Sequence, residues 1–233
     1  MCLDLILPSG VNSLDRLLNG GLLTGLITHV YGEAGSGKTT FALQFVRAAC
    51  RLGVRTTYMN TEGSSPIERL EQISEKDFSE IEDLVRIIVP KSFEEQGAII
   101  DDLELYAREN TRLLVIDTLT RLYRVVLEDR KTTYVAHREL NRQAGFLKGL
   151  ASTKDIAVVV LNQVRGRVNG STDFEPVAKN IMDYWSDYVV RIRTKRGIGE
   201  RLIERIRPEI DLSNAVLYLT NNGFSNEPTH EKE

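Results

Sequence analysis

The sequence has little cysteine and no long apolar run, and each absence excludes a class of protein. Only two cysteines occur in 233 residues, Cys2 and Cys50, and their spacing fits neither a zinc site nor a disulfide framework. The first ten residues lack the basic start and apolar core of a signal peptide, and no apolar run approaches the ~20 residues that a membrane-spanning helix needs. We therefore expect a cytoplasmic protein with no membrane partner.

A general excess of positive charge is also missing, because the formal net charge is −3. The charge is nevertheless unevenly distributed along the chain. Residues 62–109 hold 14 acidic and 5 basic side chains, whereas residues 121–142 hold 6 basic and 3 acidic, and residues 191–207 hold 7 basic and 2 acidic. The two basic segments are either ordinary solvated faces or parts of an anion-binding surface.

The length and the 42% hydrophobic content are enough for one large core, so we expect a single domain over residues 1–224 and a polar, disordered tail over 225–233. Longer helix-like segments separate most of the strand-like runs, which predicts an α/β fold with a mostly parallel sheet and helices on both faces. After residue 186 closely spaced strands predict an antiparallel C-terminal extension. The strand-like runs are 26–31, 55–60, 85–90, 113–118, 156–163 and 187–193.

One short stretch, "GEAGSGKTT", matches the phosphate-binding pattern G-x-x-x-x-G-K-[ST] without a mismatch. Glycines let backbone N–H groups converge on phosphate oxygens, the lysine ammonium reaches the outer phosphates, and the hydroxyl of Thr39 is a ligand for Mg²⁺. A strand-like run precedes the loop and a helix-like run follows it, which aims a helix N-terminus at the phosphates. The residues assigned to the nucleotide are Gly32, Glu33, Ala34, Gly35, Ser36, Gly37, Lys38, Thr39 and Thr40.

Two carboxylates follow other predicted strands. Asp117 ends the apolar run "LLVID", and the carboxyl end of such a strand is where ligands of parallel sheets bind, so we expect it beside the Mg²⁺ with Thr39. The strand that contains "RTTYMN" is expected to end with Glu62, which is then positioned to orient or deprotonate an attacking water. The ordinary alternatives are a strand-capping aspartate and a surface-turn glutamate, and for Glu62 taken alone the surface turn would be preferred. The glycine loop favours the catalytic interpretation.

The order of these parts resembles the RecA/RadA recombinase family. "NTEGSSPIERL" is similar to that family's T-E-G-x-x-x-x-E-R, "RELNRQAGFLKGLASTKDIAVVVLNQV" to its R-x-x-x-L-x-x-L followed by A-V-V-x-x-N-Q-V, and "RIRTKRGIGERLIERIRPE" to its closing hairpin. The resemblance covers nearly the whole chain and implies a RecA-like P-loop NTPase core. Ser65 and Pro66 stand where the family usually has an aromatic residue and an arginine.

The resemblance also implies roles for two further side chains. Gln163, where a strand enters a loop, would contact the γ-phosphate and report the nucleotide state, which adds it to Lys38 and Glu62 as a catalytic residue. Arg69 matches the family position that packs on adenine, where a planar guanidinium suits a π face. A strand-ending amide and a helix-surface arginine are the ordinary alternatives.

In this family two loops at the carboxyl edge of the sheet hold DNA, and here they correspond to residues 119–137 and 164–180. Arginine and lysine neutralise phosphates independently of base sequence, and tyrosines can stack on unpaired bases. The DNA-binding candidates are Arg121, Arg124, Arg130, Lys131, Arg138, Arg165, Arg167 and Lys179.

The resemblance implies an accessory factor of DNA recombination and repair that binds ATP, Mg²⁺ and DNA. Only 31 residues precede Gly32, so we expect a core without the family's helical N-terminal domain or its F-x-x-A docking arm. That predicts a monomer or dimer rather than a filament, weak ATPase activity little stimulated by DNA, and no strand exchange. Expected partners are other recombination proteins, such as a RadA-type recombinase or a Holliday-junction nuclease. A KaiC-like signalling ATPase and a nucleotide-gated adaptor without DNA binding remain alternatives.

Overall fold

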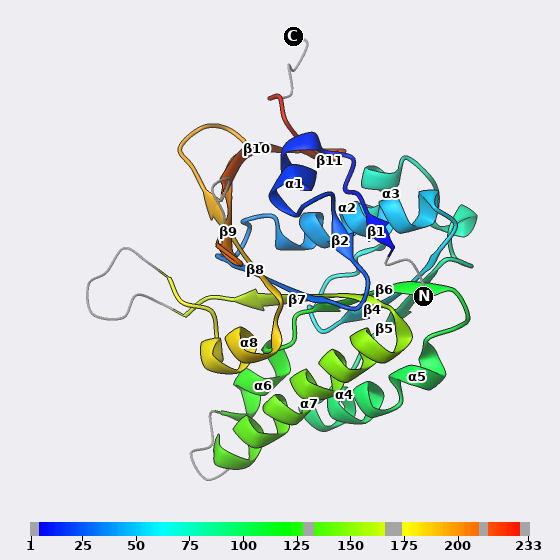
Figure 1. Cartoon of the computed structure of the whole chain (residues 1–233), viewed down its shortest axis with the longest axis vertical. Helices are drawn as coiled ribbons and strands as arrows, with labels where there is room; N and C mark the ends of the chain where they lie inside the picture. The colour runs from blue at the N-terminus through cyan, green and yellow to red at the C-terminus, as the bar shows by residue number, and fades with distance from the viewer. Residues whose placement is uncertain (1–4, 128–132, 166–173, 210–213, 229–233) are drawn as a thin grey trace.

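The computed structural model describes residues 5–127, 133–165, 174–209 and 214–228. In this part of the chain a nine-stranded sheet lies between two layers of helices (Figure 1). The strands are β1 (Ile6–Leu7), β2 (Leu22–Leu23), β3 (Ile27–Gly32), β4 (Arg55–Asn60), β5 (Val85–Ile88), β6 (Thr111–Asp117), β7 (Ala157–Gln163), β8 (Tyr188–Thr194), β9 (Glu200–Arg207), β10 (Asn214–Thr220) and β11 (Gly223–Ser225). The helices are α1 (Asn12–Leu17), α2 (Lys38–Arg51), α3 (Ile67–Ser74), the 3₁₀ helix η1 (Phe78–Glu80), α4 (Phe93–Asp101), α5 (Leu103–Tyr106), α6 (Arg121–Val126), α7 (Thr133–Lys154) and α8 (Lys179–Trp185).

The large sheet has the strand order β11-β10-β9-β8-β3-β7-β6-β4-β5. From β8 to β5 neighbouring strands run parallel, and β9, β10 and β11 are added antiparallel at the β8 side. This arrangement confirms the predicted α/β fold with a mostly parallel sheet and an antiparallel C-terminal extension.

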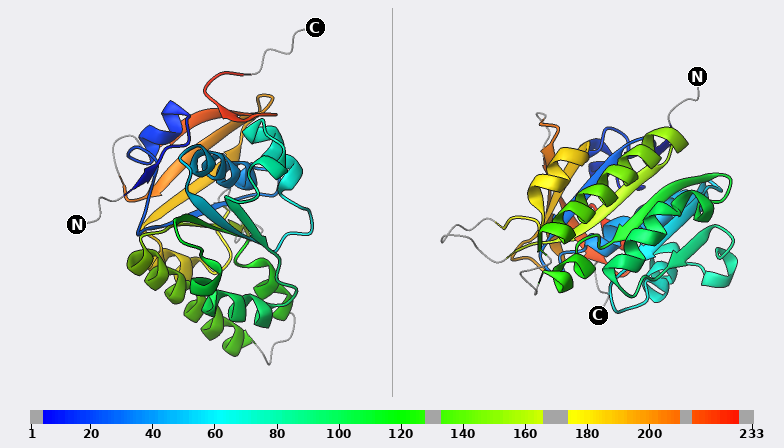
Figure 2. Two further views of the ribbon diagram at one scale, coloured as in Figure 1. Left: turned by 90° about the vertical axis from the view of Figure 1, so that its right-hand side faces the viewer. Right: turned by 90° about the horizontal axis from the view of Figure 1, so that it is seen from below.

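Apolar side chains on both faces of the central strands explain why both faces are covered. On β6, Leu113 and Val115 belong to the core under α1, α2 and α3, whereas Leu114 and Ile116 belong to the core under α4 to α8. Successive side chains of a strand point to opposite faces, so a strand that is apolar at every position needs a helix layer on each side. The two layers, above and below the sheet in Figure 1, remain separate in the left view of Figure 2.

Three details differ from the sequence prediction. The small two-stranded antiparallel sheet β1–β2, separate from the large sheet, has strands of two residues each, too short to give a periodic pattern. The strand β4 ends at Asn60, so Glu62 lies two residues beyond it. The strand β8, which the spacing groups with the antiparallel extension, pairs parallel with β3 and is antiparallel only to β9.

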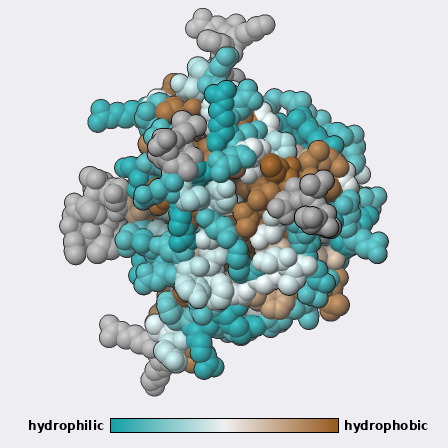
Figure 3. Space-filling view, viewed as in Figure 1, coloured by the Kyte–Doolittle hydropathy of each residue, from teal (hydrophilic) through white to brown (hydrophobic). Residues whose placement is uncertain are grey.

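Within the described ranges, no helix is long and apolar enough to cross a membrane. The face seen in Figure 3 is largely hydrophilic, apart from an apolar area over β1 and β2. At the other end of the chain β11 extends to Ser225, one residue into the predicted polar tail, and residues 229–233 lie outside the described ranges, so the disorder of the tail stays a prediction.

Candidate nucleotide-binding site

The predicted site residues come from four parallel strands whose carboxyl ends meet at one edge of the sheet. Gly32, the last residue of β3, is the register partner of Gln163, the last residue of β7. In the same way Asn60, at the end of β4, pairs with Asp117, at the end of β6. Residues far apart in the sequence therefore lie at one edge because parallel strands bring their ends together.

The glycine loop joins β3 to α2, and two positions in it require glycine for steric reasons. A Cβ on Gly32 would lie 2.4 Å from the backbone oxygen of Ile192 on β8, so only glycine fits there without displacing backbone. Gly37, directly before α2, has φ +103°, in the left-handed region that L side chains rarely adopt. The loop thereby delivers the N-terminus of α2, with its free N–H groups, to the sheet edge.

Lys38, the first residue of α2, is only 8% exposed. Its Nζ donates to the backbone oxygens of Gly32 and Glu33, at 2.9 and 2.7 Å. Burial lowers the pKa of this ammonium, while the charges of Asp117, Glu62 and Glu33 oppose that shift. A buried ammonium at a helix N-terminus is a suitable partner for a phosphate anion.

Thr39 and Asp117 form the contact expected of a magnesium site. The Thr39 hydroxyl donates to Asp117 Oδ2 at 2.8 Å, and the Tyr58 hydroxyl donates to the same oxygen at 2.7 Å. Burial raises the pKa of Asp117, and these two hydrogen bonds work in the opposite direction by stabilising the carboxylate. Both predicted metal ligands therefore lie side by side, and oxygen ligands of this kind suit Mg²⁺.

Glu62 is held beside this pair by contacts from three other segments. Its Oε1 accepts hydrogen bonds from Gln163 Nε2 at 3.1 Å and from the Thr118 hydroxyl at 3.4 Å. Its Oε2 lies 3.9 Å from Nε of Arg121, with which it forms an ion pair. The backbone of Thr61 is fixed as well, since its N–H donates to the backbone oxygen of Asp117 at 2.7 Å.

A cavity of about 460 Å³ connects these groups, a size that fits a small-molecule ligand. The donor set fits ATP and Mg²⁺, because a helix N-terminus, a buried ammonium and a hydroxyl–carboxylate pair line one cavity. Ser36 Oγ adds a buried polar atom that lacks a hydrogen-bond partner among the described residues. The predicted residues that line the cavity are Ala34, Gly35, Gly37, Lys38, Thr39, Thr40, Glu62, Arg69, Asp117 and Gln163; Gly32, Glu33 and Ser36 shape the loop behind them.

Arg69 lies on α3 and is tied to the loop after β10. Its guanidinium donates to the backbone oxygens of Thr220 and Asn221, at 2.7 and 2.6 Å. Leu219 and Pro66 line the same cavity and give this region an apolar character. The predicted packing of Arg69 on an adenine stays a prediction.

A second cavity, of about 620 Å³, adjoins the first at Gln163 and is basic. Three of the predicted DNA-binding residues, Arg121, Arg124 and Arg165, line it. Arg124 donates to Gln163 Oε1 at 2.7 Å, so one amide contacts Glu62 through its nitrogen and Arg124 through its oxygen.

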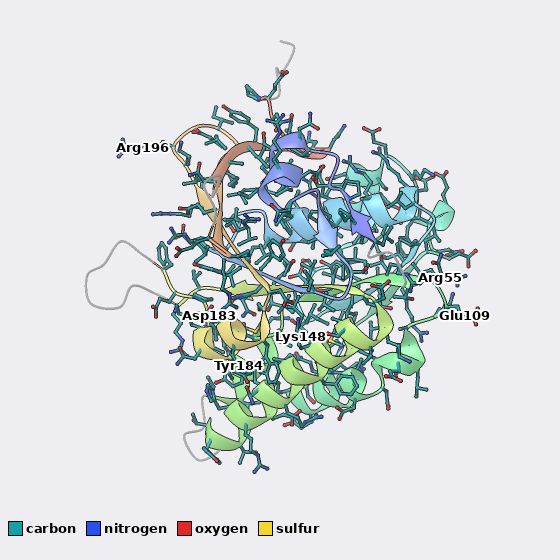
Figure 4. The ribbon with its side chains drawn as sticks, in the orientation of Figure 1. Arg55, Glu109, Lys148, Asp183, Tyr184 and Arg196 are labelled. Atoms are coloured by element: carbon teal, nitrogen blue, oxygen red, sulfur yellow. The ribbon has the colours of Figure 1, made fainter. Side chains whose placement is uncertain are left out.

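The remaining DNA-binding candidates are not part of this cavity. Arg138 is exposed on α7, and Lys179, at the start of α8, pairs with Asp183 at 3.0 Å. Figure 4 shows Asp183 next to Tyr184 on α8, away from the hairpin that carries Arg196. Arg130, Lys131 and Arg167 lie outside the described residues.

Sequence reasoning missed two side chains that support the site. Tyr58, the one tyrosine of β4, donates to Asp117, and a lone aromatic residue in a threonine-rich strand is the signal that could have indicated it. Arg201 on β9 donates to the backbone oxygens of Ser36 and Gly35, at 3.0 and 3.3 Å. No local pattern indicates that contact, because 165 positions separate Arg201 from Ser36.

Comparison with known proteins agrees with this geometry. The Rad51 family model matches residues 4–227, which is nearly the whole chain. The chain belongs to the Rad51 family. Three archaeal proteins are similar to it over most of their length, and each is named "DNA repair and recombination protein RadB".

The RadB protein of Methanococcoides burtonii is 35% identical over 207 residues, covering 87% of this chain and 91% of the relative. That of Methanosphaera stadtmanae is 36% identical over 193 residues, covering 81% of each chain, and that of Archaeoglobus fulgidus is 35% identical over 206 residues, covering 87% and 90%. The chain is thus a member of the archaeal RadB branch of the Rad51 family, which confirms the predicted resemblance and favours it over a KaiC-like ATPase.

Proposed function

We propose that the protein binds ATP with Mg²⁺ and binds DNA without sequence preference, as an accessory factor of homologous recombination and DNA repair. The observation that carries the nucleotide part is the 2.8 Å contact between Thr39 and Asp117, beside Lys38 in one cavity. The family and the names of its RadB relatives support the role in recombination and repair.

Each group in the nucleotide cavity has a distinct task in this proposal. The loop N–H groups and Lys38 bind the phosphates, and Thr39 and Asp117 hold the Mg²⁺. The metal, when bound, neutralises charge on the β- and γ-phosphates. Glu62 orients the attacking water, and Gln163 fixes the Glu62 carboxylate through its amide nitrogen.

The proposal includes slow hydrolysis with little stimulation by DNA and no strand exchange. Among the described residues that line the nucleotide cavity, the cations are Lys38 and Arg69, and Arg69 donates to the loop after β10. Phosphoryl transfer that lacks an arginine contributed from outside is slower by roughly 10³ to 10⁵. ATP then acts mainly as a ligand that selects one conformation, and the protein works in the cytoplasm as a monomer or dimer.

DNA would bind at the basic cavity next to the nucleotide. Arg124 and Arg165 line that cavity, and arginine neutralises phosphates independently of base sequence. Lys179 contributes less, because Asp183 already pairs with it. The partners would be other recombination proteins, such as a RadA-type recombinase or a Holliday-junction nuclease, through which the protein would affect the processing of branched DNA.

Calorimetry tests the nucleotide part. Lys38→Ala should abolish binding of an ATP analogue with Mg²⁺ while the fold persists, and Lys91→Ala, which removes an exposed lysine before α4, should bind normally. Unchanged affinity in the Lys38 variant would show that the cavity is not the nucleotide site. Rapid turnover with DNA, or helical filaments in electron microscopy, would instead indicate a true strand-exchange recombinase.

A salt series tests the DNA part. The double variant Arg124→Ala with Arg165→Ala should lower DNA affinity and reduce the log-log salt slope by roughly 0.7 to 0.9 for each phosphate that is no longer neutralised. Arg108→Ala, an exposed arginine before β6, is the matched control. If the wild-type protein binds no DNA at any salt concentration, the adaptor function replaces this part of the proposal.

A further inference from the structure

Arg121 makes contacts that differ from those expected of a DNA-binding arginine. It is the first residue of α6, directly after the loop that follows Asp117. Its Nη1 donates to the backbone oxygen of Thr61, and its Nε forms the ion pair with Glu62 Oε2 at 3.9 Å. One guanidinium thus holds both the backbone and the carboxylate of the segment that carries the proposed water-orienting group.

With this ion pair, both oxygens of the Glu62 carboxylate are engaged within the chain. Oε1 accepts from Gln163 and Thr118, and Oε2 faces Arg121. The pair is partly exposed, with 42% of the Arg121 side chain and 30% of the Glu62 side chain accessible. Ion pairs of this exposure are modest in strength, so their effect on a rate is a small factor rather than an all-or-none block.

We propose that Arg121 is a positioning residue that holds Glu62 in an intramolecular ion pair and thereby keeps ATP hydrolysis slow. A carboxylate orients or deprotonates water through a free oxygen, and the positive charge beside Oε2 competes with the water for it. The inference rests on the proposed ATP site and adds a cause for slow turnover that lies inside one chain.

The expected effect is a change in kcat without a change in binding. Arg121→Ala should raise DNA-free turnover at saturating ATP by about twofold to fivefold, which corresponds to about 0.4 to 1 kcal/mol at 1.36 kcal/mol per tenfold. KM and the calorimetric affinity for the nucleotide should stay within about twofold. Arg121→Lys, which keeps the charge, should remain closer to wild type, and Arg108→Ala should match wild type.

A second measurement tests the ion pair between Arg121 and Glu62 in the absence of nucleotide. A double-mutant cycle of Arg121→Ala and Glu62→Gln, read from denaturant unfolding, should show a coupling equivalent to a similar factor in the unfolding equilibrium constant. Turnover of Arg121→Ala at or below the wild-type value, or a coupling of zero, overturns the inference. If calorimetry shows no nucleotide binding by the wild-type protein, the proposed function itself fails, and the inference fails with it.

Discussion

His29, in the middle of β3, predicts that acid destabilises the strand that leads into the glycine loop. The imidazole is fully buried, and neither ring nitrogen has a hydrogen-bond partner among the described residues. Burial lowers the pKa of His29 from 6.5 to about 4; the charge of Asp183 opposes the shift and that of Arg207 adds to it. The neutral ring stacks on Tyr31, with 5.6 Å between centroids.

The sign and size of the effect follow from proton linkage. Between pH 6.5 and 4 the unfolded chain binds a proton at His29 that the folded protein does not, so the free energy of unfolding falls as the pH falls. With these two pKa values the loss between pH 7 and pH 5 is about 2 kcal/mol, and it approaches about 3.4 kcal/mol below pH 4. Above pH 7 the contribution of His29 to the free energy of unfolding is constant.

Denaturant unfolding at pH 7 and pH 5 measures this loss. His29→Leu, which removes the titrating ring without adding a buried polar atom, should lose about 2 kcal/mol less than wild type between the two pH values. Arg108→Ala, at an exposed position before β6, leaves His29 in place and is the control that should keep the wild-type pH dependence. Equal losses in wild type and His29→Leu would refute the reasoning, as would an NMR titration of folded His29 with a midpoint near 6.5.

Two further predictions concern the side chains behind the nucleotide cavity. Tyr58→Phe removes the hydroxyl that donates to the buried Asp117. Denaturant titrations should show a free energy of unfolding lower by about 1.5 to 3 kcal/mol. A loss below about 0.5 kcal/mol would contradict that contact. Arg201→Ala removes both donors to the backbone of Gly35 and Ser36. Calorimetry should show about fivefold to tenfold weaker nucleotide binding, as expected for the loss of about 1 to 1.4 kcal/mol. Unchanged affinity would mean that the loop keeps its shape without Arg201.

The strands that position the site could be predicted because each leaves a local pattern. The run "RTTYMN" is β4 to the residue, and β6 ends at Asp117 as expected, since an apolar strand closed by a carboxylate changes character abruptly. Parallel strands then bring Gly32, Asp117 and Gln163 to one edge without further information. Site residues at strand ends are therefore accessible from sequence.

Contacts between distant side chains were not accessible in this way. The pairing of Arg121 with Glu62 joins residues 59 positions apart, and nothing in either local sequence indicates it. The charge pattern also gives the wrong environment for Arg205. This residue belongs to a strongly basic segment, which predicts an exposed side chain, but it is only 2% exposed on β9. Its guanidinium lies over the Tyr188 ring at 5.7 Å and donates to Asn19 at 3.2 Å, an environment set by tertiary packing.

Gln163 links the two cavities through a single amide. The nitrogen donates to Glu62 and the oxygen accepts from Arg124, so a rotation that improves one contact disturbs the other. A nucleotide that attracts this amide would rotate it only to the extent that the nucleotide binds the rotated arrangement more tightly. The rotation would change the environment of Arg124, and each ~1.4 kcal/mol of that preference would change DNA affinity tenfold. By the same linkage, DNA would change nucleotide affinity by an equal factor, which makes coupling at Gln163 a property of binding that does not require hydrolysis.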